Sequence, residues 1–373
     1  MHSEREQLQK LVGISRYYGS DPDYVIAGGG NTSYKNRDNL WIKASGIPLA
    51  GITEGGFVCM SRPWLKKVGE KHYSNDPVKR EDEVKKDLAA AVVSPENLRP
   101  SVETSLHDLI EFAFVVHTHP TIVNALMCSV DAAVSTEKLF GDKAIYIPYT
   151  DPGYTLFKKI SEEVELYVKL HDKSPSIIFL QNHGVFVGAD TVDEVKQIYG
   201  DMMDKLTTGL SIKLPSGRIK EVESELLFLI RNQLEKKGLS SKAFKGELIE
   251  HFTKSREAFS RIERPFTPDI IVYCKSNYLF LARNTGRDEL TDRLENFRTG
   301  YGYYPKVILV EGGEMIINDE SDKSVDIARD VFLDMMKISL LSENFGGPHF
   351  MTVDQVAFID NWEVENYRRK IAK

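Results

Sequence analysis

The chain has 373 residues, with 48 Lys and Arg against 55 Asp and Glu, which gives a formal net charge of −7 at pH 7. Hydrophobic residues make up 42% of it and charged residues 28%, which is typical of folded globular proteins and excludes extended disorder. This length exceeds what one ordinary core holds, so we expect two domains.

Targeting and redox signals point to the cytoplasm. No apolar run approaches the roughly 20 residues that span a bilayer, and residues 1–11 are charged, unlike a signal peptide. The three cysteines form no C-x-x-C pair, which fits a reducing compartment. The net acidity argues against nucleic acids and membrane surfaces as partners, because both favour basic patches.

The first part of the chain predicts a sheet with helices packed on it. Short apolar runs separated by Gly and Asn are typical of strands joined by tight turns, and longer segments with helical periodicity lie between them. Strands are expected at residues 24–27, 32–35, 40–43, 57–61, 112–116, 144–147, 177–180 and 185–187. Helices are expected at residues 3–18, 77–92, 121–129, 153–170 and 191–210.

A boundary is predicted at residues 214–217, which read Leu-Pro-Ser-Gly. It divides an α/β domain at 1–214 from a smaller α+β domain at 215–373. The sequence itself shows no internal repeat. In the second part we expect helices at 219–262, 286–297 and 322–342, strands at 270–273, 278–282, 307–311 and 315–317, and an irregular, then helical end. The charged helix at 219–262 is interpreted as a solvated face.

The strongest functional signal is the pair His117 and His119, which follows an apolar strand. Residues i and i+2 of a strand point to the same face, so the two imidazoles would lie side by side. His183 leaves another apolar strand and could complete a site of three histidines with an open position. Each feature also has a structural interpretation, as polar residues at strand ends or a histidine in a turn. As a set they predict a divalent transition metal, most readily Zn²⁺.

Proton chemistry at such a metal needs a carboxylate, and Glu103 precedes the histidine strand. Glu103 could be an ordinary carboxylate at a helix N-terminus, or it could act as a general base on a substrate. Ser101, in the same turn, offers a hydroxyl and main-chain N–H groups to an anion.

Two glycine-containing loops could bind the same anion. Gly30 and Asn31 belong to a Gly-Gly-Gly-Asn-Thr-Ser run that lacks the dinucleotide fingerprint, so a Rossmann site is not predicted. Ser45 and Gly46 end the next strand. Each loop could be a simple tight turn, but together with the metal residues they describe a pocket for an anionic sugar.

These residues resemble the class II aldolase/adducin family, and more narrowly the aldolase half of bifunctional rhamnulose-1-phosphate aldolase/alcohol dehydrogenase proteins. The family motifs occur in order over residues 5–212. They are Gly30-Asn31-Thr32-Ser33, Ala44-Ser45-Gly46, Pro100-Ser101-Val102-Glu103, His117-Thr118-His119-Pro120 and Asn182-His183-Gly184. The narrower likeness adds residues 104–107, 266–269 and 358–363. No dinucleotide fingerprint is present, so dehydrogenase activity is not expected of this chain.

The resemblance implies a three-layer αβα domain and a role for each site residue. His117, His119 and His183 would hold Zn²⁺, and Glu103 would move the proton of an enediolate. Tyr149 would protonate the leaving aldehyde from a neighbouring subunit, or would simply pack at an interface. Binding of the substrate phosphate would fall to Gly30, Asn31, Ser45, Gly46 and Ser101.

The resemblance therefore implies cleavage of a ketose 1-phosphate, of rhamnulose or fuculose type, to dihydroxyacetone phosphate and an aldehyde. A homotetramer with sites between subunits is expected. Val102 replaces a second serine found in phosphate-using members, which leaves an unphosphorylated sugar or sugar acid open. A 4-epimerase, a dehydratase and a non-enzymatic, adducin-like interaction module are the alternatives.

Overall fold

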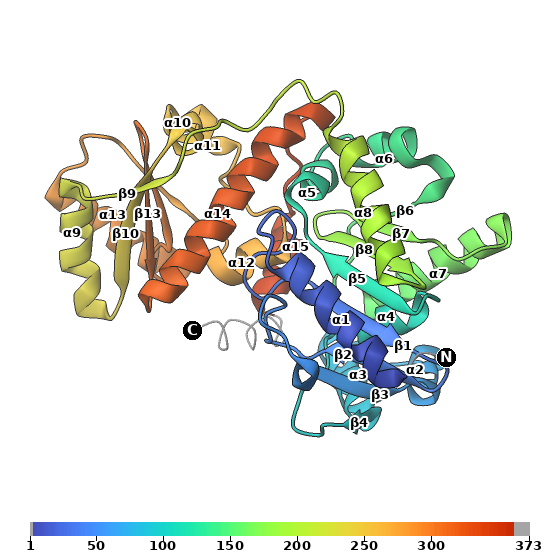
Figure 1. The fold of residues 1–373 in the computed structure, drawn as a ribbon. Helices are drawn as coiled ribbons and strands as arrows, with labels where there is room; N and C mark the ends of the chain where they lie inside the picture. Colours follow the sequence, from blue (N-terminus) through green and yellow to red (C-terminus); the bar gives the residue numbers. More distant parts are fainter. Residues whose placement is uncertain (1–2, 362–373) are drawn as a thin grey trace. The chain divides into compact units, whose positions relative to one another are not determined.

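A computed structural model describes residues 3–361, and these residues form two compact units (Figure 1). Within this range, unit 1 comprises residues 3–127 and 131–209, and unit 2 comprises residues 128–130 and 210–361. Trp362 and Glu363, which belong to the resemblance noted at the end of the chain, lie outside the described residues.

Unit 1 is built on a mixed sheet of eight strands in the order β4-β3-β2-β1-β5-β8-β7-β6. Neighbouring strands are antiparallel except for the parallel pair β6 and β7. The strands are β1 (Asn31–Lys35), β2 (Asn39–Lys43), β3 (Phe57–Ser61), β4 (Val92–Ser94), β5 (Phe114–Thr118), β6 (Ile145–Ile147), β7 (Ile177–Leu180) and β8 (Gly184–Ala189).

Helices cover both faces of this sheet, which makes three layers and confirms the predicted α/β class. Helices α1 and α8 contact β5 on one face, whereas α4 and α7 pack on β1, β2 and β6 on the other. The helices are α1 (Glu4–Gly19), α2 (Arg62–Glu70), α3 (Pro77–Ala90), α4 (Thr104–Leu109), α5 (Thr121–Met127), α6 (Ala132–Phe140), α7 (Tyr154–His171) and α8 (Val192–Thr207), with 3₁₀ turns η1 (Glu54–Gly56) and η2 (Gly141–Lys143).

The core of unit 1 lies between these layers. Alternate residues of β6, β7 and β8 point at α4 and α7, as the period of two along a strand requires. Phe186 and Ile160 are fully buried there. β5, in the middle of the sheet, is buried along its whole length, so whatever polar side chains it carries are held in a rigid setting.

Unit 2 has a sheet of five strands in the order β11-β12-β13-β10-β9, in which only β11 and β12 are parallel. Helices α9 and α13 pack on one face, and α14 lies on β13 and β10. The strands are β9 (Lys220–Val222), β10 (Ser240–Lys245), β11 (Leu279–Leu281), β12 (Val307–Val310) and β13 (Glu314–Asp319). The helices are α9 (Glu225–Leu234), α10 (Glu247–Thr253), α11 (Arg256–Ser260), α12 (Pro268–Cys274), α13 (Arg287–Tyr301), α14 (Asp322–Ser342) and α15 (Val353–Asn361), with 3₁₀ turns η3 (Glu235–Lys237) and η4 (Glu343–Phe345).

Three predicted elements are wrong. Residues 24–27 form no strand, because the N–H groups of Tyr24 and Val25 both bond back to the carbonyl of Asp21 and close a turn over residues 21–25. Residues 270–273 lie inside helix α12, which begins with Pro268 at its first turn. The predicted helix 219–262 is broken by β9 and β10, since pairing with β13 overrides the local helical tendency of a charged segment.

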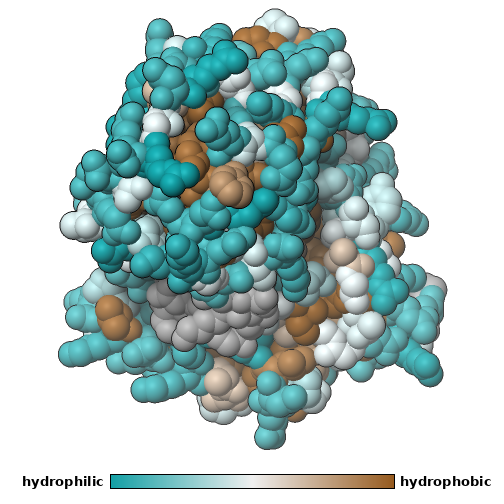
Figure 2. Space-filling view, turned by 90° about the vertical axis from the view of Figure 1, so that its left-hand side faces the viewer, coloured by the Kyte–Doolittle hydropathy of each residue, from teal (hydrophilic) through white to brown (hydrophobic). Residues whose placement is uncertain are grey.

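Figure 2 shows one face on which hydrophilic side chains prevail and apolar ones form smaller groups. Among the described residues, no helix combines the length and the hydropathy that a membrane span requires.

Candidate active site

Three histidines of unit 1 meet beside the central strand β5. His117 is the fourth residue of that strand and is fully buried, and His119 follows one residue beyond its end. His183 comes from the turn between β7 and β8, and β8 is the antiparallel neighbour of β5. One ring nitrogen of each histidine lies within 4.8 Å of the others, and the Nε2 atoms of His117 and His119 are 2.9 Å apart.

The local sequence holds the rings in this arrangement. The Nδ1 atom of His117 lies 3.0 Å from the carbonyl oxygen of Val185, which can only accept, so Nδ1 carries the proton and Nε2 keeps its lone pair. Asn182 adopts a positive φ of 55° in the turn before His183. A side chain at Gly184 would clash with the His119 ring, because an added Cβ would lie 2.6 Å from its Cδ2 atom.

Glu103 brings a carboxylate to the same place. It is the N-cap residue of α4, is only 7% exposed, and its Oε1 atom lies 3.5 Å from Nε2 of both His117 and His183. Its Oε2 atom accepts a hydrogen bond of 2.5 Å from the side-chain amide of Asn31, whereas Oε1 has no hydrogen-bond partner among the described residues. A buried carboxylate oxygen without a donor is costly, so the site calls for a cation there.

The protonation states suit metal binding. Burial lowers the pKa of His117 well below its usual value, which keeps the ring neutral. Burial acts to raise the pKa of Glu103. Any proton that the facing imidazoles of His117 and His183 take up, and the hydrogen bond from the Asn31 amide, lower the pKa and prevail, so the carboxylate stays ionised. Three imidazole nitrogens are a donor set that a divalent transition metal accepts, and the ionised carboxylate of Glu103 faces the same space.

Behind Glu103 runs a buried polar chain that the sequence analysis missed. The Nδ1 atom of His107 lies 2.7 Å from the Ser33 hydroxyl, and its Nε2 atom bonds to the Asn31 side-chain oxygen. The Asn31 amide therefore has protein partners at both ends, His107 on one side and Glu103 on the other. The sequence spacing could have indicated this role, because His107 stands four residues after Glu103, which is about one turn along a helix.

The structure gathers the predicted anion-binding residues at strand ends of the same sheet. Gly30 precedes β1, where its φ is +67° and an added Cβ would lie 2.8 Å from the His117 carbonyl oxygen. Ser45 and Gly46 follow β2, and an isolated bridge between Ala44 and Pro100 places them beside the Ser101 turn. The Ser101 hydroxyl accepts from the Glu103 N–H at 3.2 Å.

Tyr149 lies just after β6, and its main-chain N–H donates to the Gln181 side chain at 3.0 Å. Gln181 begins the turn that carries His183, so the two segments are tied together. Burial, with the Asp151 carboxylate nearby, raises the pKa of the Tyr149 hydroxyl. The hydroxyl therefore keeps its proton at neutral pH.

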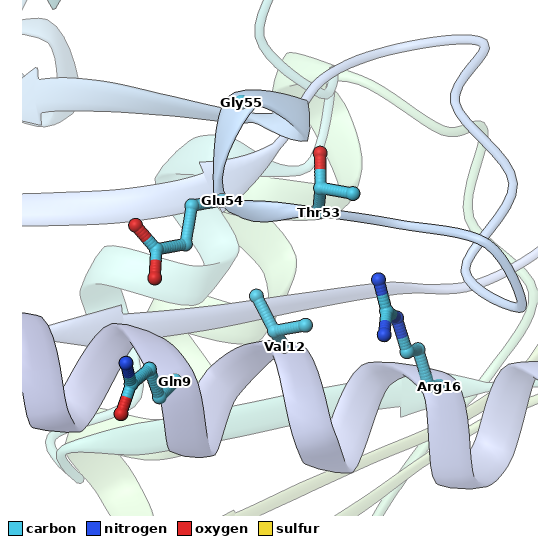
Figure 3. A pocket seen from close by; sticks show the side chains of 6 residues that line it. All are labelled: Gln9, Val12, Arg16, Thr53, Glu54 and Gly55. Carbon is cyan, nitrogen blue, oxygen red and sulfur yellow. The ribbon is translucent and has the colours of Figure 1, made fainter.

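A separate hollow lies between α1 and η1 on unit 1 (Figure 3). Arg16, at one end of it, donates from Nε to the Ile52 carbonyl oxygen at 2.7 Å. None of the histidines or Glu103 lines this hollow, whose walls are Gln9, Val12, Arg16, Thr53, Glu54 and Gly55.

Sequence comparison decides the family. The profile described as "Class II Aldolase and Adducin N-terminal domain" matches residues 9–200, just over half of the chain. The chain belongs to this family. The predicted resemblance is thereby confirmed, and the family includes metal-dependent aldolases and epimerases.

Two relatives extend this result. The "Uncharacterized oxidoreductase YuxG" of Bacillus subtilis (strain 168) is 22% identical over 414 residues, which cover 98% of this chain and 58% of that protein. The chain thus spans little more than half the length of that relative, whose name fits the predicted likeness to aldolase/dehydrogenase proteins. The "L-fuculose phosphate aldolase" of Methanocaldococcus jannaschii is 25% identical over 182 residues, covering 46% of this chain and 80% of that protein.

Among solved structures, the N-terminal class II aldolase domain of a conserved protein from Thermoplasma acidophilum is similar. It has a TM-score of 0.47 and 26% identity, over 55% of this chain and 94% of that one.

Proposed function

We propose that the protein is a zinc-dependent class II aldolase that cleaves a ketose 1-phosphate, of the rhamnulose or fuculose type, into dihydroxyacetone phosphate and an aldehyde. The observation that carries the proposal is the convergence of three imidazoles with the Oε1 atom of Glu103, which has no hydrogen-bond partner among the described residues. The relative named L-fuculose phosphate aldolase supports the substrate class.

His117, His119 and His183 would hold the cation, and zinc fits three neutral imidazoles. When bound, a divalent cation supplies Lewis-acid polarisation of a sugar's carbonyl oxygen. Glu103 faces the same space with an ionised Oε1 atom, so it is placed to accept a substrate proton and to return it. The hydrogen bond from Asn31 to Oε2 fixes the carboxylate with Oε1 towards the histidines.

The phosphate group would lie near the strand ends that carry Gly30, Asn31, Ser45, Gly46 and Ser101. Main-chain N–H groups and hydroxyls at such turns bind anions, although Val102 supplies no hydroxyl beside Ser101. Since both amide atoms of Asn31 have protein partners, its contribution would be mainly to position Glu103.

Tyr149 would protonate the leaving aldehyde in a homotetramer that brings it to a neighbouring subunit's site. Light scattering of the purified protein should give the mass of four chains, whereas a monomer would remove Tyr149 from this role. We also propose a cytoplasmic location, in keeping with three cysteines that are all free and buried.

The test is a screen of ketose 1-phosphates and their unphosphorylated forms with zinc-loaded protein. We expect release of dihydroxyacetone phosphate, measured by a coupled reductase assay, that stops on chelation and returns with Zn²⁺. A H117A variant should lose both the metal and the activity. Formation of a C4 epimer or a dehydrated sugar without a three-carbon ketone would replace the proposal with the epimerase or dehydratase alternative.

A further inference from the structure

Unit 2 repeats the strand order of the centre of unit 1. Read from β9, its sheet runs β9-β10-β13-β12-β11, and the unit 1 sheet contains β1-β5-β8-β7-β6 in the same order. In both, the first three neighbouring pairs are antiparallel and the last pair is parallel. In both, a helix joins the two parallel strands, namely α7 in unit 1 and α13 in unit 2.

The repeat extends to single residues. Strands β7 and β12, strands β8 and β13, and helices α8 and α14 begin 130 residues apart (307 − 177, 314 − 184 and 322 − 192). The N-terminal capping boxes keep the same spacing, with Thr191 and Glu194 in unit 1 and Ser321 and Ser324 in unit 2. An unbroken spacing across two strands, two turns and a helix start is unexpected of independent folds that share only a topology.

Hydrogen bonds outside the regular elements also recur. The first residue of each turn bonds back to the edge strand, Gln181 N–H to the Ile147 carbonyl at 3.0 Å and Glu311 N–H to the Leu281 carbonyl at 2.9 Å. The second residue of each turn bonds to the helix after the central strand, Asn182 N–H to the Met127 carbonyl at 3.1 Å and Gly312 N–H to the Thr253 carbonyl at 3.0 Å.

The residue pairs across neighbouring strands then show which residues of unit 2 correspond to the three histidines of unit 1. His117 pairs with Phe186 across β5 and β8, and Ala243 pairs with Ile316, the matching residue, across β10 and β13. Two residues further along the chain from Ala243 and from His117, Lys245 corresponds to His119. The 130-residue spacing matches Gly313 to His183 and Glu314 to Gly184.

A charged cluster of unit 2 occupies this position. The Lys245 Nζ atom lies 3.5 Å from Oε2 of Glu314, whose Oε1 accepts a hydrogen bond of 2.5 Å from the Ser224 hydroxyl. Ser224 is the N-cap residue of the helix that precedes the central strand, as Glu103 is in unit 1. A lysine ammonium has no lone pair to offer a metal, and it supplies the positive charge that the carboxylate requires.

We propose that residues 220–342 are a second, diverged copy of the class II aldolase core, in which the ammonium of Lys245 stands where unit 1 would bind a metal. The described part of the chain then carries one transition-metal site, in unit 1, and unit 2 is a copy that binds no metal. Among the described residues, the three histidines of unit 1 are the group that could hold a metal ion. The inference holds whichever sugar is the substrate.

Hydrogen–deuterium exchange of the full chain, with and without Zn²⁺, tests the difference between the copies. We expect Zn²⁺ to protect peptides covering residues 114–120 and 177–189, and to leave the matching peptides at 240–246 and 307–319 unchanged. A K245A variant should exchange faster at 240–246 and 307–319 in both conditions. Zinc-dependent protection of the unit 2 peptides in the native chain would overturn the proposal.

A gain of metal binding tests the register itself. In an H117A/H119A background, A243H/K245H places two imidazoles on the strand face that carries Glu314, and we expect about one Co²⁺ to bind, seen as ligand-field absorption. The matched control is S240H/K242H, which puts two histidines on the opposite face of β10. If exchange shows both variants folded, equal Co²⁺ binding would overturn the match. If A243H/K245H fails to fold, the zinc-protection experiment on the native chain still decides.

Discussion

Units 1 and 2 share strand order, register and turns, yet they differ in the few side chains that allow chemistry. Where unit 1 places His117 and His119, unit 2 has Ala243 and Lys245. The main chain and the apolar core are alike at these positions, with Phe186 of unit 1 and Ile316 of unit 2 both fully buried. The comparison teaches that this fold supplies a rigid place for ligands, while the activity depends on a handful of residues at strand ends.

The two units also differ in the residues that contact and orient the site residues. In unit 1, Asn31 pairs with His117 across β1 and β5 and connects Glu103 to the buried His107. In unit 2, the residue that pairs with Ala243 is Val222, which has no amide to offer. Unit 1, which has the three histidines, therefore also has a buried hydrogen-bond chain that orients the Glu103 carboxylate. Burying these polar groups costs free energy of folding.

The largest expected effect comes from the matched N-cap residues Glu103 and Ser224. E103Q keeps the shape but removes the base, so turnover should fall by ~10² or more while metal content stays unchanged. S224A should lower stability by about 1 kcal/mol through the lost cap and leave turnover unchanged. Steady-state kinetics with metal analysis measures both variants, and equal turnover of E103Q and wild type would remove Glu103 from the mechanism.

A smaller effect is expected at the next matched pair, His107 and Phe228, which stand four residues after each N-cap. H107A removes the hydrogen bond that orients Asn31, worth about 1–1.5 kcal/mol, so kcat should fall roughly 10-fold with KM and metal content unchanged. H107Q retains a donor and should recover part of the rate. F228A is the control, because Phe228 is 58% exposed on unit 2 and should not affect turnover. Full kcat in H107A would mean that Asn31 needs no such support.

Much of unit 1 could be predicted from sequence because its signals are local. The alternation of His117 and His119 on an apolar strand gives their shared face directly. The role of His107 could not be predicted, because it depends on β1 crossing the start of α4, a contact between residues more than 70 positions apart.

Unit 2 shows the opposite case. Strand β10, with the sequence Ser-Ser-Lys-Ala-Phe-Lys, has weak strand signals and forms because it pairs with β9 on one side and β13 on the other. Without that strand, the relation of Lys245 to His119 is invisible, and so is the repeat. Helix α14 was predicted with its full bounds, 322–342, since its apolar periodicity is sustained over many turns.

The last comparison concerns stability and not turnover, because half-buried Lys306 in unit 2 and buried Lys35 in unit 1 have different partners. In unit 2, Lys306 lies 2.5 Å from the Asp319 carboxylate. In unit 1, Lys35 is 5% exposed and its Nζ atom donates to a neutral partner, the His107 carbonyl oxygen, at 2.6 Å. Burial lowers the pKa of Lys35 to about 7, although the nearby Asp108 acts in the opposite direction.

The sign of the pH dependence follows from this pKa. Between pH 7 and the ordinary lysine value of 10.5, the unfolded chain holds a proton at Lys35 that the folded chain has released, so the free energy of unfolding rises with pH. The slope for one proton is at most about 1.4 kcal/mol per pH unit, and the gain is lost as pH falls towards 7. In denaturant unfolding of the full chain from pH 7 to 9.5, wild type should therefore gain stability relative to K35M. K35R, which stays charged throughout, should not gain. A constant difference between wild type and K35M across this range would show that Lys35 keeps its proton in the fold.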